Sequence, residues 1–155
     1  MNKDAGFSLM ELMVVIMIIA IMAAITVPNV GTWVQNHRLS STARDIYAML
    51  QMSRLRAAKE NANVAFIFDS SGYSAFVDNG SGGGMANDTI QNGTELTVFS
   101  GTFEGGVTYN GATVPQMSFD SRGFPTAFGT RIFLSNSIGA TKQVILSFAG
   151  NVRIQ

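Results

Sequence analysis

The sequence predicts an α+β protein in which a long N-terminal helix, transmembrane over its first half, packs on an antiparallel β-sheet domain. The first indication is an apolar run of 21 residues, Phe7 to Val27, interrupted only by Ser8, Glu11 and Thr26. As a helix this run is about 31 Å long, close to the hydrocarbon thickness of a bilayer. An amphipathic stretch and a series of alternating apolar segments follow it, and these predict the rest of the fold.

The apolar run has the length of a membrane anchor and lacks the marks of a cleaved secretory signal. Its only preceding base, Lys3, is offset by Asp4, the run exceeds the usual apolar core, and no A-x-A site follows. A plain anchor does not account for Glu11, since a carboxylate at the centre of a membrane helix costs about 2.5–3.5 kcal/mol and less near an end. Glu11 is therefore predicted to be functional.

The helix is predicted to continue to about residue 60. Apolar or small residues recur at spacings of four and three, which describes one face of a helix, and these are Leu39, Ala43, Ile46, Leu50, Ser53 and Ala57. Pro28 lacks a backbone donor and clashes with the preceding turn, so a helix kink is expected there.

The remaining chain alternates in the manner of β-strands. Predicted strands lie at 63–69, 73–78, 95–100, 105–110, 116–120, 131–136, 142–148 and 151–155. The first two are expected to form a hairpin, as are the last two, through Ala149 and Gly150. The segment "NGSGGGMAND" is predicted from its composition to be a flexible loop.

The segment "GFSLMELMVVIMIIAIMAAITVPN" resembles the class III signal of type IV pilins and type II secretion pseudopilins. The resemblance implies a leader at residues 1–6, cleavage by a prepilin peptidase between Gly6 and Phe7, and N-methylation of Phe7. A residue without Cβ at position 6 would let the backbone approach the peptidase closely. Residues 7–28 would then form the transmembrane and assembly helix, and 29–155 a periplasmic domain with a pilin-like fold.

The resemblance also implies a role for Glu11 in filament assembly, as the partner of the N-terminal amine of a neighbouring subunit. A buried pair contributes little net stability, but loss of one member leaves the other charge unpaired, so the pair selects register. A carboxylate that merely reaches the lipid headgroups is the alternative. The implied partners are the peptidase, other pilin or pseudopilin subunits, the inner membrane and its assembly platform.

Features of the second half are similar to the FimT/GspH group of minor pilins and pseudopilins. They are the hairpin after the helix, "FDSRGFP" at 119–125, the terminal "VILSFAGNVRIQ" and the lack of cysteine. The implied function is that of a structural subunit of a type IV pilus or type II secretion pseudopilus. An anchored receptor that never polymerises is a further alternative, and the choice between pilus and secretion system is left open.

DNA binding for uptake is an alternative function that the charge distribution leaves open. The chain as a whole has ten Lys and Arg against ten Asp and Glu, but the last third carries a net charge of +3. Its candidate phosphate contacts, opposed by Asp120, are Arg122, Arg131, Lys142 and Arg153. DNA-binding FimT-type pilins end in "GRxR", whereas this chain has "GNVR", so Asn151 replaces one arginine and weakens the DNA reading.

Neither an enzyme nor a cofactor is expected. The single histidine, His37, has no nearby partner in sequence for a metal pair or an activated nucleophile. The acids Asp69, Asp78 and Asp88 flank the glycine-rich segment, where calcium is conceivable, but their spacing matches no defined calcium loop.

Overall fold

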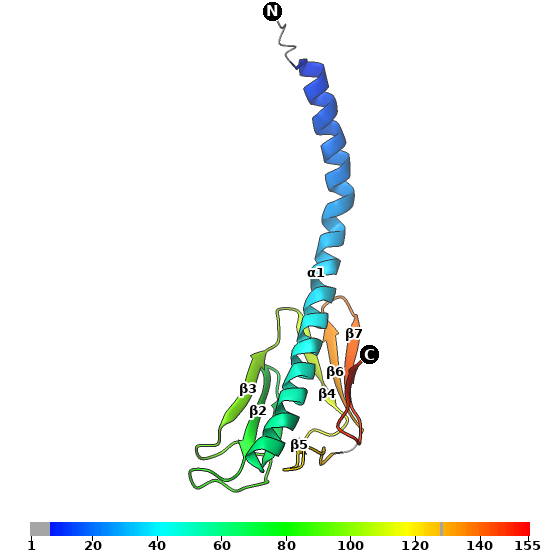
Figure 1. The fold of residues 1–155 in the computed structure, drawn as a ribbon. Coiled ribbons are helices and arrows are strands. Elements are labelled where there is room, and N and C mark those ends of the chain that lie inside the picture. Colours follow the sequence, from blue (N-terminus) through cyan, green and yellow to red (C-terminus); the bar gives the residue numbers. More distant parts are fainter. Residues whose placement is uncertain (1–6, 128) are drawn as a thin grey trace, which may run out of the picture. The chain divides into compact units, whose positions relative to one another are not determined.

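A computed structural model describes residues 7–127 and 129–155, which form a long helix followed by strands (Figure 1). The elements are α1 (Leu9–Glu60), β1 (Asn63–Phe68), β2 (Gly72–Asp78), β3 (Thr97–Thr102), β4 (Val107–Ala112), β5 (Met117–Phe119), β6 (Thr130–Asn136), β7 (Thr141–Leu146) and β8 (Val152–Ile154). This order confirms the predicted α+β class. The predicted leader, residues 1–6, lies outside the described residues.

The chain divides into two compact units, Met1–Val34 and Gln35–Gln155. The predicted division into an assembly helix at 7–28 and a domain at 29–155 stays a prediction. In the first unit the side chains from Phe7 to Thr26 are exposed. Its most apolar 18-residue window has a mean hydropathy of 2.7 and no buried residue. By length and composition, α1 can therefore cross a membrane.

In the second unit, α1 buries the stripe that the sequence predicted. Leu39 is 2% exposed, and the other five stripe residues have no exposed surface. The helix ends after Glu60 because Asn61 adopts a left-handed backbone conformation with φ of 51°. The amide of Ala62 then donates to the carbonyl of Ala57 at 3.3 Å, which satisfies a carbonyl of the last turn.

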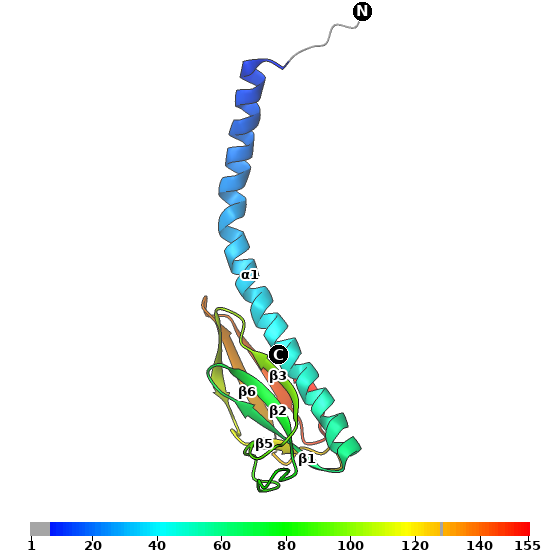
Figure 2. The same ribbon diagram turned by 90° about the vertical axis from the view of Figure 1, so that its left-hand side faces the viewer.

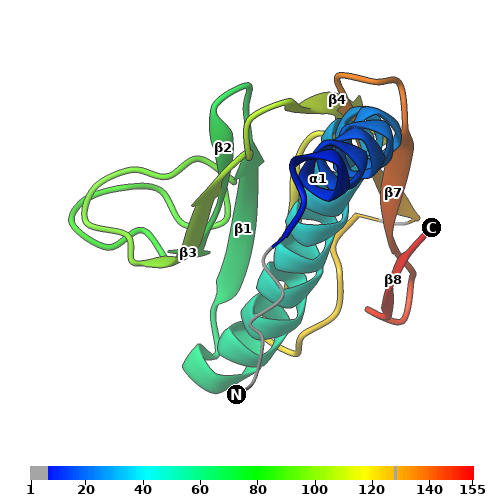
Figure 3. The ribbon, with the colours of Figure 1, turned by 90° about the horizontal axis from the view of Figure 1, so that it is seen from above.

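The strands form two antiparallel sheets, where the sequence predicted one. Their strand orders are β3-β2-β1-β5 and β4-β6-β7-β8. Figures 1 and 3 show strands of the two sheets on either side of the second half of α1, which Figure 2 shows lying along the strands. The chain changes sheets three times, between β3 and β4, between β4 and β5, and between β5 and β6. Alternating periodicity does not predict a change of sheet. It indicates which face of a strand is buried, but it does not indicate which strands pair with each other.

Both predicted hairpins are confirmed. In the first, Asn63 pairs with Asp78, and in the last, Val144 pairs with Ile154. Strand β3 begins at Thr97, two residues later than predicted. Glu95 is only 6% exposed, and its carboxylate accepts a hydrogen bond from the amide of Gly80 in the preceding loop, so it is not part of the strand.

The core lies between the stripe of α1 and the inner faces of the two sheets. Phe66 and Phe119 meet edge to face, with ring centroids 5.6 Å apart. Burial of each such side chain contributes about 1.5–3 kcal/mol.

A series of aromatic rings connects the two sheets. Phe68 of β1 stacks on Tyr109 of β4 with centroids 5.5 Å apart, and Phe103 stacks on the same tyrosine at 6.1 Å. Tyr73 of β2 contacts both phenylalanines, at 6.5 Å and 5.4 Å. Burial, followed by repulsion from the carboxylates of Asp45 and Glu104, raises the pKa of Tyr73 to about 12. Tyr73 is therefore a neutral phenol well beyond physiological pH.

The glycine-rich segment is a loop held by hydrogen bonds to two buried carboxylates, and its predicted flexibility stays a prediction. The carboxylate of Asp78 accepts from the amides of Asn87 and Thr89, at 2.5 and 2.8 Å. The carboxylate of Glu95 accepts from the amides of Gly80 and Asn92, both at 2.9 Å. Both acids are nearly fully buried. Amino-acid composition does not predict these hydrogen bonds, because the bonds depend on which carboxylates are buried in the folded domain.

Candidate functional site

The start of α1 carries the predicted assembly residues. Phe7 is 82% exposed, and Ser8 caps the helix, since its Oγ accepts from the amide of Met10 at 3.3 Å. Glu11 lies in the first turn, three residues after the cap, where its charge complements the positive end of the helix. The Ser-x-x-Glu spacing was visible in the sequence, so this role of Glu11 within its own helix could have been predicted.

Glu11 has no ion-pair partner among the described residues. Its carboxylate is exposed, and the two ion pairs found in the described parts of the chain, Arg56–Glu60 and Arg122–Asp120, lie in the second unit. Glu11 is therefore open to a partner from outside the chain. Gly6 lies outside the described residues, and Pro28 lies within α1, where the predicted kink stays a prediction.

Arg122 is engaged with its own turn. Its guanidinium lies 3.0 Å from the carboxylate of Asp120, which also accepts from the amides of Arg122 and Phe124. Although partial burial opposes the effect, the hydrogen bonds from Phe124 and Arg122 and the charge of Arg122 lower the pKa of Asp120. The positive charge of Arg122 is therefore largely balanced by Asp120 and is less available for a phosphate group.

Arg131 and Arg153 lie on one face of the second sheet. Both are exposed and both pair in register with Ile145, from β6 and β8 respectively. A cavity of about 340 Å³ beside them is lined by Ile145, Ser147, Asn151 and Arg153. Lys142 pairs with the fully buried Leu134 and so belongs to the opposite face. The fold therefore brings together two of the four predicted phosphate contacts.

The three acids considered for calcium do not converge. Asp69 accepts from the hydroxyl and amide of Ser71 and the amide of Gly72, and these bonds lower its pKa. Asp88 bonds Ile90 and Asn92, and Asp78 bonds other loop amides. Within residues 7–127 and 129–155, no three His, Cys, Asp or Glu side chains are placed to share a metal ion. His37 is exposed on α1.

Polar residues of α1 connect it to distant parts of the chain. Arg38 donates to the carbonyl of Gly105 at 3.0 Å, and Arg54 donates to that of Gly150 at 3.3 Å. The side-chain amide of Asn136 donates to Asn36 Oδ1 at 3.0 Å. No local signal identifies these residues, because each partner lies far along the chain.

Two family models match the chain. The model for "Type II transport protein GspH" matches residues 42–150, and the model for the "Prokaryotic N-terminal methylation motif" matches residues 1–27. The search of curated proteins gave no match.

Several solved structures share the fold. The type IV minor pilin FimU of Pseudomonas aeruginosa aligns with a TM-score of 0.60 and 15% identity over 79% of this chain and 92% of its own. The minor pseudopilin EpsH from the type 2 secretion system of Vibrio cholerae aligns with a TM-score of 0.54 and 15% identity, covering 76% and 96% of the two chains. GspH of E. coli aligns with a TM-score of 0.56 and 14% identity, covering 77% and 89%.

Proposed function

The chain belongs to the GspH family and is a minor pilin or pseudopilin subunit. We propose that it assembles into a filament through residues 7–28 after removal of residues 1–6. The proposal includes cleavage between Gly6 and Phe7 by a prepilin peptidase and N-methylation of Phe7. It treats the chain as a structural subunit and assigns it no catalytic step.

The observation that carries the proposal is the coincidence of the methylation motif with an uncovered helix. The motif spans residues 1–27, and the described side chains of that range are exposed from Phe7 to Thr26. Exposed apolar surface of this extent requires lipid or other helices to cover it. A bilayer can cover it before assembly, and the helices of neighbouring subunits can cover it afterwards.

Glu11 supports assembly through a charge pair. Cleavage would create a positive amine on Phe7, and a carboxylate in an apolar bundle needs such a partner. We place this pairing between neighbouring subunits, so that one register satisfies both charges. Its competitor is the capping role of Glu11 within its own helix.

Two matched variants separate the two roles of Glu11. Glu11→Gln removes the charge and keeps a residue that suits the third position of a capped helix, whereas Ser8→Ala removes the cap and keeps the charge. We expect Glu11→Gln to be inserted and cleaved but depleted from sheared filaments, and Ser8→Ala to be incorporated. The reverse pattern, measured by quantitative mass spectrometry of purified filaments, would reject the charge pair.

The location follows from the same helix. We propose a single pass through the inner membrane with residues 29–155 in the periplasm, and extraction from there by the assembly platform into a pilus or pseudopilus. Protease protection of the domain in intact cells, and its digestion after the outer membrane is permeabilised, is the expected result. Digestion only after lysis of the inner membrane would overturn this orientation.

A further inference from the structure

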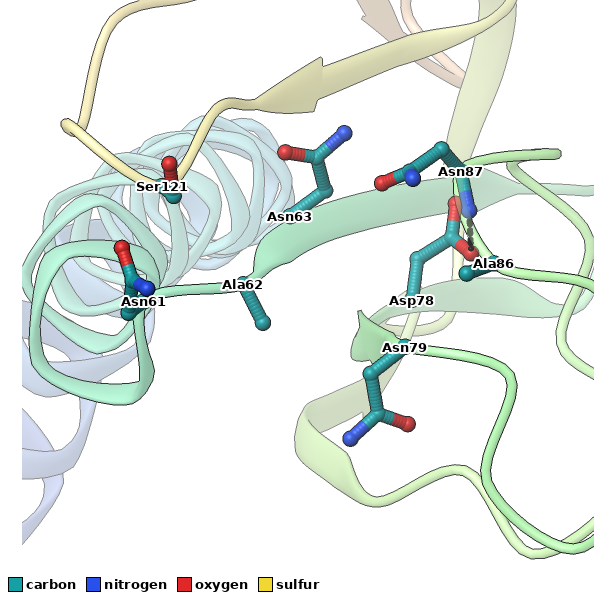
Figure 4. Close-up of a pocket in the computed structure, with 8 residues that line it drawn as sticks. All are labelled: Asn61, Ala62, Asn63, Asp78, Asn79, Ala86, Asn87 and Ser121. Atoms are coloured by element: carbon teal, nitrogen blue, oxygen red, sulfur yellow. Dashed lines mark hydrogen bonds between the residues drawn. The ribbon is translucent and has the colours of Figure 1, made fainter.

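A polar cavity lies at the end of α1, apart from the assembly helix (Figure 4). Its volume is about 360 Å³, at the lower end of the range for small-molecule sites. Four separate segments form it, and the lining residues are Asn61, Ala62, Asn63, Asp78, Asn79, Ala86, Asn87 and Ser121.

The lining offers several hydrogen-bonding groups that the described part of the protein does not use. No hydrogen bond from the side-chain amides of Asn61, Asn63 or Asn87 to another described residue is found. In Figure 4 the side chains of Asn63 and Asn87 point toward one another, and Asn61 lies beside Ser121. Each carboxamide has two donor hydrogens and an acceptor oxygen. The cavity therefore presents donors and acceptors together.

Internal hydrogen bonds hold the loop that lines the cavity. Asp78 is 1% exposed, and its carboxylate accepts from the amides of Asn87 and Thr89, so it fixes the backbone that carries the Asn87 side chain. Asn61 and Asn87 hold left-handed backbone conformations, with φ of 51° and 64°. Such conformations are costly for residues other than glycine and persist where the surrounding structure imposes them.

We propose that this cavity binds a neutral saccharide unit. Hydroxyl groups donate and accept at the same time, which suits carboxamides set around one space. The lining contains no Lys, Arg or His to hold an anion and no large apolar side chain to hold a hydrophobic ligand. It contains one carboxylate, whereas divalent cations are held by several oxygen ligands with more charge.

The test is an NMR titration of the full chain, isotopically labelled, in micelles of a detergent without a sugar headgroup. The probes are glucose, galactose, mannose and N-acetylglucosamine, added separately to millimolar concentrations, with calcium chloride and inorganic phosphate as comparison ligands. We expect at least one sugar to shift the side-chain amide signals of Asn61, Asn63 and Asn87 saturably, and calcium and phosphate not to do so.

The left-handed positions permit variants that spare the backbone. Glycine adopts positive φ without strain, so Asn61→Gly and Asn87→Gly remove the carboxamides and keep the local conformation. Each should weaken sugar binding by about three- to tenfold, the loss expected for one or two hydrogen bonds. Asn151→Ala, which removes an exposed amide at the other cavity, is the matched control and should bind as the wild type does.

Three outcomes would overturn the proposal. They are no shift of these signals with any sugar, saturable shifts with calcium alone, or sugar binding that both glycine variants retain at wild-type strength. Dispersed spectra of the variants verify that they are folded, and the wild-type titration decides the question even if a variant is not.

Discussion

The two halves of α1 have similar secondary structure and opposite environments. In the first half every side chain from Leu9 to Thr26 is exposed, although most are large and apolar. In the second half one stripe is completely buried while Leu55, on another face, remains 73% exposed. The first half is apolar around its circumference, and the second is amphipathic.

This difference indicates where each half finds its stabilising contacts. An amphipathic helix needs one covered face, which the two sheets supply within the chain. A helix that is apolar all round must be covered on all sides, and this chain has no second apolar layer for it among the described residues. The second half therefore stabilises the domain, and the first half is the part that we propose contacts lipid and other subunits.

The largest effect is expected at the proposed peptidase site, between Gly6 and Phe7. Gly6→Leu should leave the leader attached in nearly all molecules, because the peptidase must close around a small residue at the bond it cuts. Intact-mass spectrometry of the membrane-extracted protein measures this, with Ala5→Leu as the neighbouring control. A wild-type chain that still begins at Met1 in cells containing the peptidase would contradict the assignment.

Three leucines of α1 test the comparison directly. Leu50→Ala, at a fully buried position, should lower the free energy of unfolding by about 2–5 kcal/mol through lost burial and a residual cavity. Leu55→Ala should change it by less than about 0.5 kcal/mol. Leu12→Ala, in the first half, should leave unfolding of the domain unchanged. Denaturant titration of the full chain in micelles measures all three, and equal losses would refute the division of roles.

Glycine substitutions should have opposite signs in the two regions. Gly150 has a φ of 76°, and a Cβ there would lie 3.2 Å from Arg54 Cζ, so Gly150→Ala should destabilise the domain by about 1–2 kcal/mol. Gly31 lies within α1, and nothing lies within 4 Å of a Cβ added there. Gly31→Ala should therefore favour the helix by about 0.5–1 kcal/mol, visible as reduced amide exchange around it. Stabilisation by both would count against the role of the Gly150 turn.

Alkaline pH should weaken the domain through Tyr73. Its pKa is raised from 10.0 to about 12 in the folded protein, so the unfolded chain loses this proton at lower pH than the folded chain. Stability is then highest below pH 10 and falls as the pH rises from about 10 to about 12. Tyr73→Phe should reduce this fall. Identical alkaline profiles for wild type and Tyr73→Phe would contradict the burial of the phenol.

The smallest effect is expected for DNA. With Arg131 and Arg153 as the cations that share a face, the logarithm of affinity should fall with the logarithm of salt concentration at a slope no steeper than about −1.8. Arg153→Ala should make the slope shallower by about 0.9, and Lys142→Ala should leave it unchanged. Mobility-shift titrations at low and moderate salt should show weak binding or none. Tight binding with a slope near −3.6 would show that all four predicted cations contribute.

Local patterns account for the features that the sequence predicted correctly. The burial of the stripe from Leu39 to Ala57 and the end of α1 at Glu60 follow from helical periodicity and from Asn61. The hairpins β1–β2 and β7–β8 follow from short turns between alternating segments. In each case the deciding residues are close in sequence, so these features can be predicted from one amino-acid sequence.

Tertiary structure decided what depends on distant residues. The division into two sheets, the hydrogen bonding of the glycine-rich loop and the placement of Arg131 and Arg153 on either side of Ile145 have no local signal. They follow from which strands become neighbours and which carboxylates are buried, and these are properties of the packed domain. The residue pattern alone predicts a membrane-length helix that carries Glu11 near its start and continues as an amphipathic helix, because 3.6-residue periodicity and a long apolar run are local properties. Only the folded chain brought the asparagines at residues 61, 63 and 87 around Asp78, because that cavity is assembled by packing the end of the helix against strand ends and loops.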